Sequence, residues 1–229
     1  MQTLLFKSAA LTFIAAFAIA ALVLASQPQY KGVRAGHADE NYLDSQKCIA
    51  CHPDHYASWA RTYHSRMTQD ARPTTVQGDF ERDNRLEYLG IKARMERRDR
   101  AFTMTFESVD SGRRVFTVDR TVGSRRVEQY LTMQQGQYLR LPLAYDLINR
   151  RWISLNGSFF YPDGRNYFQH QTQWDSNCVF CHNVKAQPHL NPKNRAFDTE
   201  VTELGIACGA CHGPAAAQDR KSTRLNSSH

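Results

Sequence analysis

All six cysteines of this chain occur in pairs, and each pair is followed at once by a histidine. The pattern Cys-x-x-Cys-His is typical of covalent haem attachment. Two thiols at this spacing form thioether bonds to the porphyrin, and the adjacent imidazole binds the iron as an axial ligand. The three motifs are Cys48, Cys51 and His52; Cys178, Cys181 and His182; and Cys208, Cys211 and His212. The sequence therefore predicts three haem c groups, with one of these histidines on each iron.

Two other interpretations of paired cysteines fit less well. A structural zinc ion takes four ligands, and three pairs that each carry their own histidine do not divide into such sets. A redox-active Cys-x-x-Cys is expected once, in a thioredoxin-like context, rather than three times. Neither interpretation explains why a histidine follows every pair.

Each iron has a second axial position, and His64 is the first candidate to fill one of them. Aromatic residues at three- or four-residue spacing predict a helix that starts at Pro53 and continues past His64. The helical residues that separate His64 from His52 rise by roughly 18 Å. Two axial ligands of one iron lie much closer together than that. If the helix is continuous, His64 therefore binds a different haem from the one beside His52.

His170 is the second candidate, because it is the only histidine between His64 and His182 and lies close to two haem motifs in the sequence. His55 is too close to His52 to reach the opposite face of the same ring. The weaker candidates are His37, His55, His189 and Met67. Two good candidates for three irons leave one haem five-coordinate, or bound by a residue beyond Gln218.

Between the first and second motifs the hydrophobic period changes from that of a helix to that of a strand. Short alternating runs from Thr74 to about Leu155 predict an antiparallel β-meander. The clearest runs are 101–106, 115–118, 129–133, 137–143 and 151–155. Its arginines are expected on a solvated face, with one or two able to bind haem propionates. The expected fold class is α+β, with haem-wrapping helices and loops at both ends, a central antiparallel β-meander and little regular structure around the haems.

The N-terminus predicts export. Lys7 precedes an apolar run that ends at Ala25, which is typical of a secretory signal peptide. The run is also long enough to remain as a membrane anchor, and both interpretations stay open. We expect a periplasmic protein or one on the outer face of the cytoplasmic membrane, with residues 4–25 as the point of any membrane association.

The C-terminal stretch from Asp219 to His229 is polar and has no hydrophobic period. It resembles a translated sequencing-adapter read-through, and the alternative is an ordinary disordered tail. We expect a non-native tail, with ordered structure ending near Pro214 and later native residues covering the third haem. The expected organisation is a signal peptide or anchor at 1–25, a linker at 26–44, a first haem segment at 45–73, a β-rich insert at 74–165, a second and third haem segment at 166–218 and the tail at 219–229. The short connection between the last two motifs makes the second and third haems neighbours.

The residues around the motifs resemble the cytochrome c-554-like family of multihaem c-type cytochromes, and most closely its large bacterial members with C-terminal repeats. The segments that carry the resemblance are 42–52, 59 with 63–67, 76–80, 173–174 and 203–214. The resemblance implies closely packed haems with mostly two histidine ligands, a role in electron transfer, and further haem motifs or helical repeats after the last motif. It leaves catalysis open, because relatives include enzymes that act on nitrogen and sulfur oxyanions.

The net charge of +7 suggests nucleic acid as a partner, but the rest of the sequence argues against it. Several of the basic residues lie in the two terminal segments, haem propionates would offset others, and no aromatic–basic motif is present. We predict a multihaem cytochrome that carries electrons to or from redox partner proteins or quinone-linked membrane complexes. One alternative is a multihaem oxidoreductase that acts on a small nitrogen or sulfur compound at a five-coordinate haem. Another is a haem-bearing part of a larger interaction or sensor protein.

Overall fold

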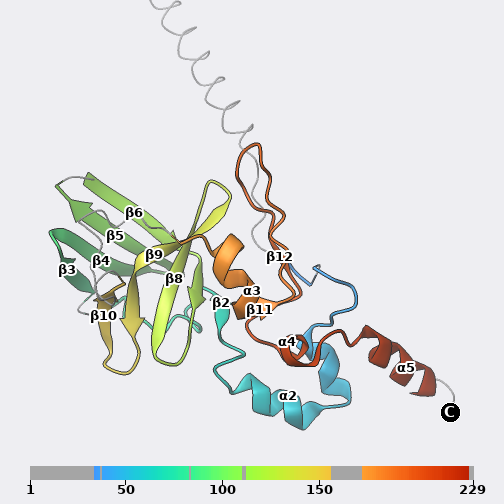
Figure 1. Ribbon diagram of the computed structural model, residues 1–229. Helices are drawn as coiled ribbons and strands as arrows, with labels where there is room; N and C mark the ends of the chain where they lie inside the picture. Colours follow the sequence, from blue (N-terminus) through green and yellow to red (C-terminus); the bar gives the residue numbers. More distant parts are fainter. Residues whose placement is uncertain (1–33, 37, 83, 110–111, 156–171, 227–229) are drawn as a thin grey trace, which may run out of the picture. The chain divides into compact units, whose positions relative to one another are not determined.

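Two antiparallel sheets occupy the middle of the chain, as the alternating sequence runs predicted (Figure 1). The computed structural model describes residues 34–36, 38–82, 84–109, 112–155 and 172–226. These residues belong to one unit, Gly32–His229. The fold class is α+β with a central β-meander, so this prediction is confirmed. The expected signal peptide or anchor lies outside the described residues, as do His37 and His170.

The first sheet has four strands in sequence order. They are β3 (Arg85–Tyr88), β4 (Ile91–Arg98), β5 (Ala101–Ser108) and β6 (Gly112–Val118). A two-residue turn at Leu89 and Gly90, both with positive φ, joins the first two strands. Sequence analysis missed β3 and β4 because charged side chains fill the exposed face of β4. The buried alternation of Ile91, Ala93 and Met95 was the signal that could have found it.

The second sheet has five strands in the order β10-β9-β8-β7-β2. They are β2 (Thr68–Asp70), β7 (Arg120–Val122), β8 (Val127–Gln134), β9 (Gln137–Asp146) and β10 (Arg151–Ser154). Strand β2 comes from the expected first haem segment and pairs with β7, with Thr68 opposite Val122. The sheet is therefore joined by backbone hydrogen bonds to the stretch that follows the first haem motif.

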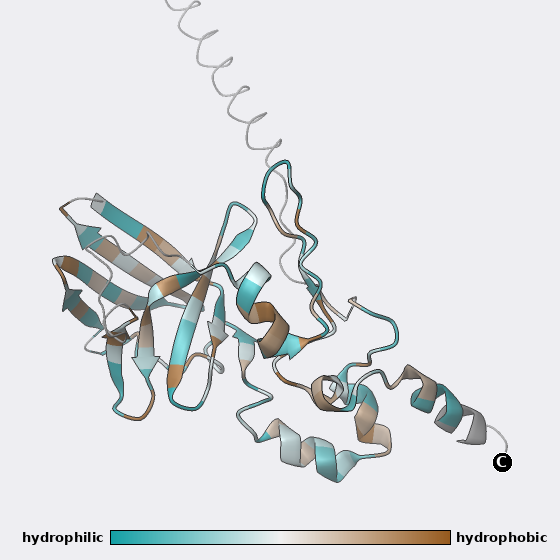
Figure 2. Ribbon diagram, in the orientation of Figure 1, coloured by the Kyte–Doolittle hydropathy of each residue, from teal (hydrophilic) through white to brown (hydrophobic). Residues whose placement is uncertain are grey.

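The apolar core contains buried side chains from both sheets, and hydrophobic positions recur along the strands of both sheets (Figure 2). Phe80 lies at its centre, with ring centroids 5.0 Å from Phe102, 5.5 Å from Tyr130 and 5.1 Å from Trp152. All three are edge-to-face contacts, a geometry that adds to the burial energy of aromatic rings. Because Phe102 belongs to the four-stranded sheet and the other two partners to the five-stranded one, Phe80 fastens the sheets together.

A buried carboxylate fixes the loop that precedes Phe80. The side chain of Glu128 on β8 is 0% exposed and accepts hydrogen bonds from the N–H groups of Gln77 and Gly78 and from Tyr130 Oη at 2.7 Å. Burial raises the pKa of Glu128 to about 7, although these three donors oppose the shift. A side chain at Gly78 would collide with Tyr130 Oη, so the close approach of loop and strand requires glycine there.

The remaining elements are short and surround the Cys-x-x-Cys-His motifs. The helices are η1 (Ser45–Ala50), α2 (Pro53–Ala60), η3 (Trp174–Cys178), α3 (Val179–His182), α4 (Cys208–His212) and α5 (Ala216–Asn226). Two pairs of two-residue strands join them: β1 (Arg34–Ala35) with β12 (Glu200–Val201), and β11 (Asn183–Val184) with β13 (Glu203–Leu204). No helix in the described part of the chain has the length and apolar character needed to cross a bilayer.

Two expectations about helices are wrong. The helix that starts at Pro53 ends at Ala60. Beyond it the N–H groups of Arg61 and Thr62 bond to carbonyls only three residues back, Ser58 O and Trp59 O, and the α-helical pattern is not continued. Ordered structure also does not end near Pro214, since the alanine-rich stretch that follows starts α5. Ala216 is buried and donates to Asn41 O, whereas residues 217–221 are exposed.

Candidate haem-binding site

Each Cys-x-x-Cys-His motif lies on or beside a short helix. The first spans the end of η1 and the start of α2, the second spans η3 and α3, and the third is α4 itself. Residues three apart on a helix point to nearly the same side, so the two thiols of each motif face one way. All six thiols are free, and the second cysteine of each motif is exposed.

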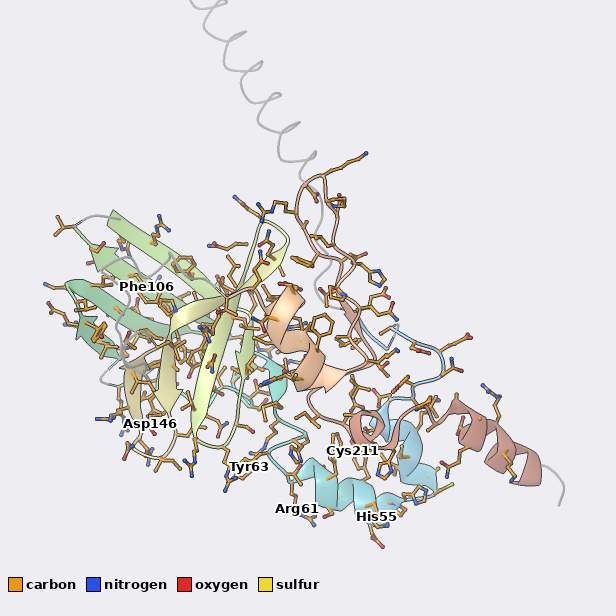
Figure 3. The ribbon with its side chains drawn as sticks, viewed as in Figure 1. His55, Arg61, Tyr63, Phe106, Asp146 and Cys211 are labelled. Carbon is orange, nitrogen blue, oxygen red and sulfur yellow. The ribbon has the colours of Figure 1, made fainter. Side chains whose placement is uncertain are left out.

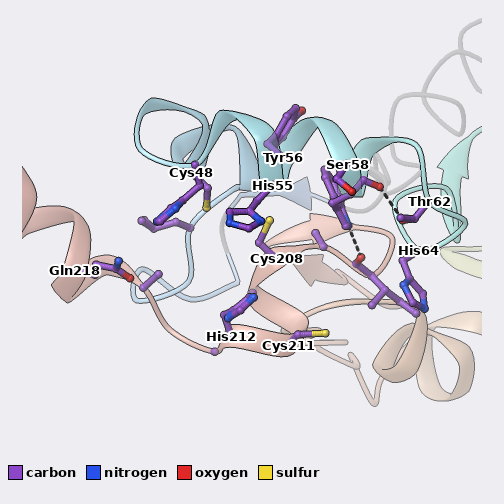
Figure 4. Close-up of a pocket in the computed structure, with 18 residues that line it drawn as sticks. Cys48, His55, Tyr56, Ser58, Thr62, His64, Cys208, Cys211, His212 and Gln218 are labelled. Carbon is purple, nitrogen blue, oxygen red and sulfur yellow. Dashed lines mark hydrogen bonds between the residues drawn. The ribbon is translucent and has the colours of Figure 1, made fainter.

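A cavity of about 660 Å³ joins the first motif to the third. Cys48 and His52 of the first motif and all three functional residues of the third contribute to its wall, together with His55 and His64 (Figure 4). His55 lies on α2 and Cys211 on α4 (Figure 3). The apolar part of the wall consists of Leu43, Tyr56, Trp59, Ile206, Ala207 and Ala215. The volume lies within the range of about 300–1,000 Å³ that is usual for cofactor sites. Apolar walls around thiols and imidazoles fit haem c. Its porphyrin ring needs apolar surroundings, its vinyl groups need two thiols, and its iron needs axial ligands.

The first and third motifs approach most closely at their first cysteines. Burial raises the pKa of the Cys48 thiol, and the neighbouring thiol of Cys208 raises it further. The second motif lies close to the third in another way, because β11 follows α3 and pairs with β13, just before α4. The expectation that the second and third haems are neighbours stays a prediction. The sequence did not suggest that the first motif shares a cavity with the third.

His64 is held against the segment that leads into the third motif. Its carbonyl oxygen accepts from the N–H of Ile206 at 3.0 Å, and Trp59 Nε1 donates to Ile206 O at 2.9 Å. Gly205 has φ of 82°, and a Cβ there would lie 2.8 Å from Ser65 O. Because α2 ends at Ala60, the helical rise no longer separates His64 from His52. These backbone contacts tie His64 to the third motif instead.

The other candidate ligands differ in position. His55 lines the cavity, with its ring centroid 6.0 Å from that of His52. His189 does not line the cavity, and its Nε2 is 3.5 Å from Glu200 Oε2. Met67 does not line the cavity among the described residues; its backbone bonds to His64 O and to Gly123 N. His37 and His170 lie outside the described residues.

The second motif is anchored on the five-stranded sheet through buried polar groups that sequence reasoning missed. Asp175 on η3 is 0% exposed and accepts from Tyr138 N and from Thr199 Oγ1, both at 2.6 Å. Burial raises the pKa of Asp175, while these bonds lower it. Thr68 on β2 donates to His182 O at 3.0 Å. Burial lowers the pKa of His182, and its Nδ1 is buried without a hydrogen-bond partner, so the neutral imidazole that binds iron is favoured.

Arg120, on β7, packs against aromatic rings next to the second motif. The guanidinium of Arg120 is 4.6 Å from the Tyr138 ring and 5.4 Å from the Trp174 ring. Its side chain is 5% exposed, and its Nε lies 3.4 Å from Asp70 Oδ1. In register, Arg120 lies opposite Leu131, which lies opposite Arg140. The arginines were expected to be mostly solvated, and Arg120 differs because its planar group stacks on two aromatic rings.

Within the described residues, no three histidine, cysteine or carboxylate side chains converge closely enough to hold a bare metal ion.

Comparisons with known proteins show what parts of this chain are similar to. A family model described as cytochrome c554 and c-prime matches residues 47–94, which include the first motif, α2 and His64. The solved crystal structure of the outer cell wall cytochrome OcwA is similar to this chain, with a TM-score of 0.51 and 17% sequence identity. The likeness covers 80% of this chain and 34% of that one, so the chain spans about a third of the length of that cytochrome. No curated protein sequence matches.

Haem-attachment motifs at a cavity, on an α+β frame with a β-meander, are features typical of c-type cytochromes. Residues 47–94 are similar to the cytochrome c554 and c-prime family, in agreement with the resemblance seen in the sequence, and the first haem motif lies at the start of the matched segment. Cys-x-x-Cys-His motifs bind haem c through two thioether bonds and an axial histidine. The residues of all three motifs suit that cofactor.

Proposed function

We propose that this chain binds three haem c groups and carries electrons between them as part of an exported multihaem cytochrome. The observation that carries the proposal is the shared cavity, where two Cys-x-x-Cys-His motifs meet apolar walls and two further histidines. Bound haem supplies one-electron redox chemistry, with a potential set by axial ligands, burial and nearby charge.

The cysteines are proposed as the tethers and the histidines as the proximal ligands. Cys48 and Cys51, Cys178 and Cys181, and Cys208 and Cys211 form the thioether bonds; His52, His182 and His212 bind iron. The one-turn helices hold thiols and imidazole of each motif in a fixed relation. The apolar wall of the cavity excludes water, which lowers the local dielectric and raises the influence of each nearby charge.

His64 is proposed as the distal ligand of the haem at the third motif. Its backbone is bonded to Ile206, two residues before Cys208, and both His64 and His212 line the cavity. The sequence argument that His64 serves a haem other than the first assumed a continuous helix, which ends at Ala60, so the proposal rests on these backbone contacts instead. His170 remains the proposed ligand for a second haem, on the sequence argument alone.

Export is supported by the N-terminal apolar run and by the likeness to a cytochrome described as belonging to the outer cell wall. The proposed location is the periplasm or the outer face of the cytoplasmic membrane, with membrane association through residues 4–25. The proposed partners are redox proteins or quinone-linked membrane complexes, and nucleic acid is not among them.

Haem stoichiometry tests the proposal. Pyridine haemochrome analysis of the purified protein should give three haems per chain, and acid–acetone should extract none of them because thioether bonds hold them. Replacing Cys178 and Cys181 together with Ala should remove one haem and leave two. One haem or none in the unmodified protein would contradict the proposal.

A spectroscopic measurement tests the role of His64. His64→Ala should convert one haem from low spin to high spin while all three remain attached. His189→Ala is the matched control, because His189 is exposed, pairs with Glu200 and does not line the cavity. A low-spin spectrum in His64→Ala would remove it from the ligand set. A high-spin haem already present in the unmodified protein would favour the oxidoreductase alternative.

A further inference from the structure

We propose that Glu203 takes up a proton when the haems at the first and third motifs are reduced, so that electron transfer in this chain is coupled to proton uptake. This inference rests on the proposed function, since it requires reducible haems at those motifs.

Glu203 is placed between the two haem segments by three hydrogen bonds. Its Oε2 accepts from the N–H of Ser45 at 2.9 Å and from Ser45 Oγ at 2.7 Å. The same hydroxyl oxygen accepts from the N–H of Cys208 at 3.1 Å. Ser45 is 0% exposed and lies three residues before Cys48. One carboxylate thus contacts the segment of the first tether and reaches the third through a single hydroxyl.

No cation compensates the charge of Glu203 among the described residues. Asp44, the N-cap of η1, is the charged group that faces it, and it carries the same sign. On β11 the residue opposite Glu203 is apolar Val184. The next residue, Lys185, pairs with Asp39 at 3.7 Å. From α4 only the backbone of Cys208 contributes, through Ser45. Burial therefore raises the pKa of Glu203; the bonds from Ser45 lower it, and Asp44 raises it again.

The carboxylate also interacts electrostatically with the position where the first haem is tethered. The charge of Glu203 is one of the causes that raise the pKa of the Cys48 thiol. In the holoprotein that sulfur is bonded to the porphyrin. A charge that acts on the sulfur therefore acts on the ring attached to it.

Coupling follows from the charge balance. Reduction adds one electron, supplied by a redox partner, and lowers the positive charge of an iron centre by one. The added negative charge makes protonation of a nearby carboxylate more favourable, and the carboxylate takes its proton from solvent as its COO⁻ becomes COOH. By reciprocity, protonation makes reduction more favourable by the same free energy. The potential of the affected haem should fall as the pH rises through the range where Glu203 titrates.

The experiment is a spectroscopic redox titration of the holoprotein at a series of pH values, starting from the ordinary pKa of 4.5 for glutamate and rising from there, because the pKa of Glu203 is raised. In the unmodified protein the potential of at least one haem should fall with pH, by at most about 59 mV per tenfold change in proton concentration. Glu203→Gln keeps an oxygen that accepts from Ser45 but cannot ionise, and it should abolish most of this slope. Glu200→Gln, a neighbouring carboxyl that faces His189, should leave the slope unchanged.

A second variant keeps the inference testable if Glu203→Gln fails to take up haem. Ser45→Ala removes one donor that favours the carboxylate, so the pH range of the slope should move upward. A potential independent of pH in the unmodified protein, or an unchanged slope in Glu203→Gln or an unchanged range in Ser45→Ala, would overturn the inference. None of these outcomes touches the proposed function, which fails instead if the three haems are absent or cannot be reduced.

Discussion

The paired sheets and the haem motifs of this chain differ in what holds them in place. Between the sheets, Met95, Met104 and Leu141 are completely buried in a cluster of apolar and aromatic side chains. By contrast, α2 and α4 bury none of their residues, and the space beside them is a cavity. Backbone and indole hydrogen bonds, such as that from Trp59 to Ile206 O, hold these helices instead.

The difference indicates where the folding energy of each region comes from. Burial of apolar surface is the main favourable term in folding, and the sheets obtain it from their own side chains. The motif helices α2 and α4 obtain little of this burial energy from the protein itself. Under the proposed function, their apolar side chains pack against the porphyrin instead. A group bound only by the folded form adds its binding energy to stability. The sheets should therefore be stable alone, and the motif region should depend on haem.

The largest expected effect is on a form that cannot attach haem, with all six cysteines replaced by Ala. Amide hydrogen exchange should show protection retained in 91–106 and 127–146 and lost in 45–67 and 203–212. The reason is that only the first two segments bury apolar side chains against one another. Equal protection in both groups would remove the contrast between the regions.

Phe80→Ala tests the sheet side of the comparison. Removing a buried aromatic ring from between two sheets should lower the free energy of unfolding by about 3–5 kcal/mol. Denaturant unfolding followed by tryptophan fluorescence measures it, while the haem spectrum should change little. Val115→Ala, at a 54% exposed position on β6, is the control and should have a small effect. A small loss in Phe80→Ala would mean that the sheets are not fastened through this ring.

Glu128 gives the sheet region a dependence on pH. Because its folded pKa of about 7 lies above the ordinary value of 4.5, the folded form holds the proton more tightly than the unfolded form. Stability should be greatest below pH 4.5 as far as this group is concerned, and should fall as the pH rises to about 7. The fall should reach at most about 3 kcal/mol. In Glu128→Gln this part of the pH dependence of unfolding should vanish; its persistence would assign it to another group.

The smallest expected effect concerns the hydrogen bond from Trp59 to Ile206, in the segment just before the third motif. Trp59→Phe removes the hydrogen bond to Ile206 O and should cost about 1 kcal/mol. It should also perturb the spectrum of one haem, because the same turn positions His64. Tyr56→Phe, on the same helix, is the control. If the two variants behave alike, the hydrogen bond from Trp59 to Ile206 O does not position His64.

The motifs can be read directly in the sequence. The fold class and most strands of the meander could be predicted from it, because they depend on the local hydrophobic period. The end of α2 was predicted wrongly, since the aromatic spacing continues past Ala60 although the backbone changes there to hydrogen bonds that reach three residues back. The pairing of β2 with β7 was also missed. The contacts between Glu203 and Ser45, and between Asp175 and Thr199, join residues far apart or of ordinary type. No local pattern marks such partners, so the shared cavity of the first and third motifs could not be foreseen.

That shared cavity has a consequence for the order of events during synthesis. Its two halves are distant in the chain: Ser45 and Glu203, which bond to each other, are 158 residues apart. The first motif is therefore synthesised well before the residues that complete its surroundings. Contacts at such separation form late in folding. Under the proposed function, a haem attached to the first motif before the third motif is made would be joined to a chain that is still open at this point, and the third motif would enclose it later.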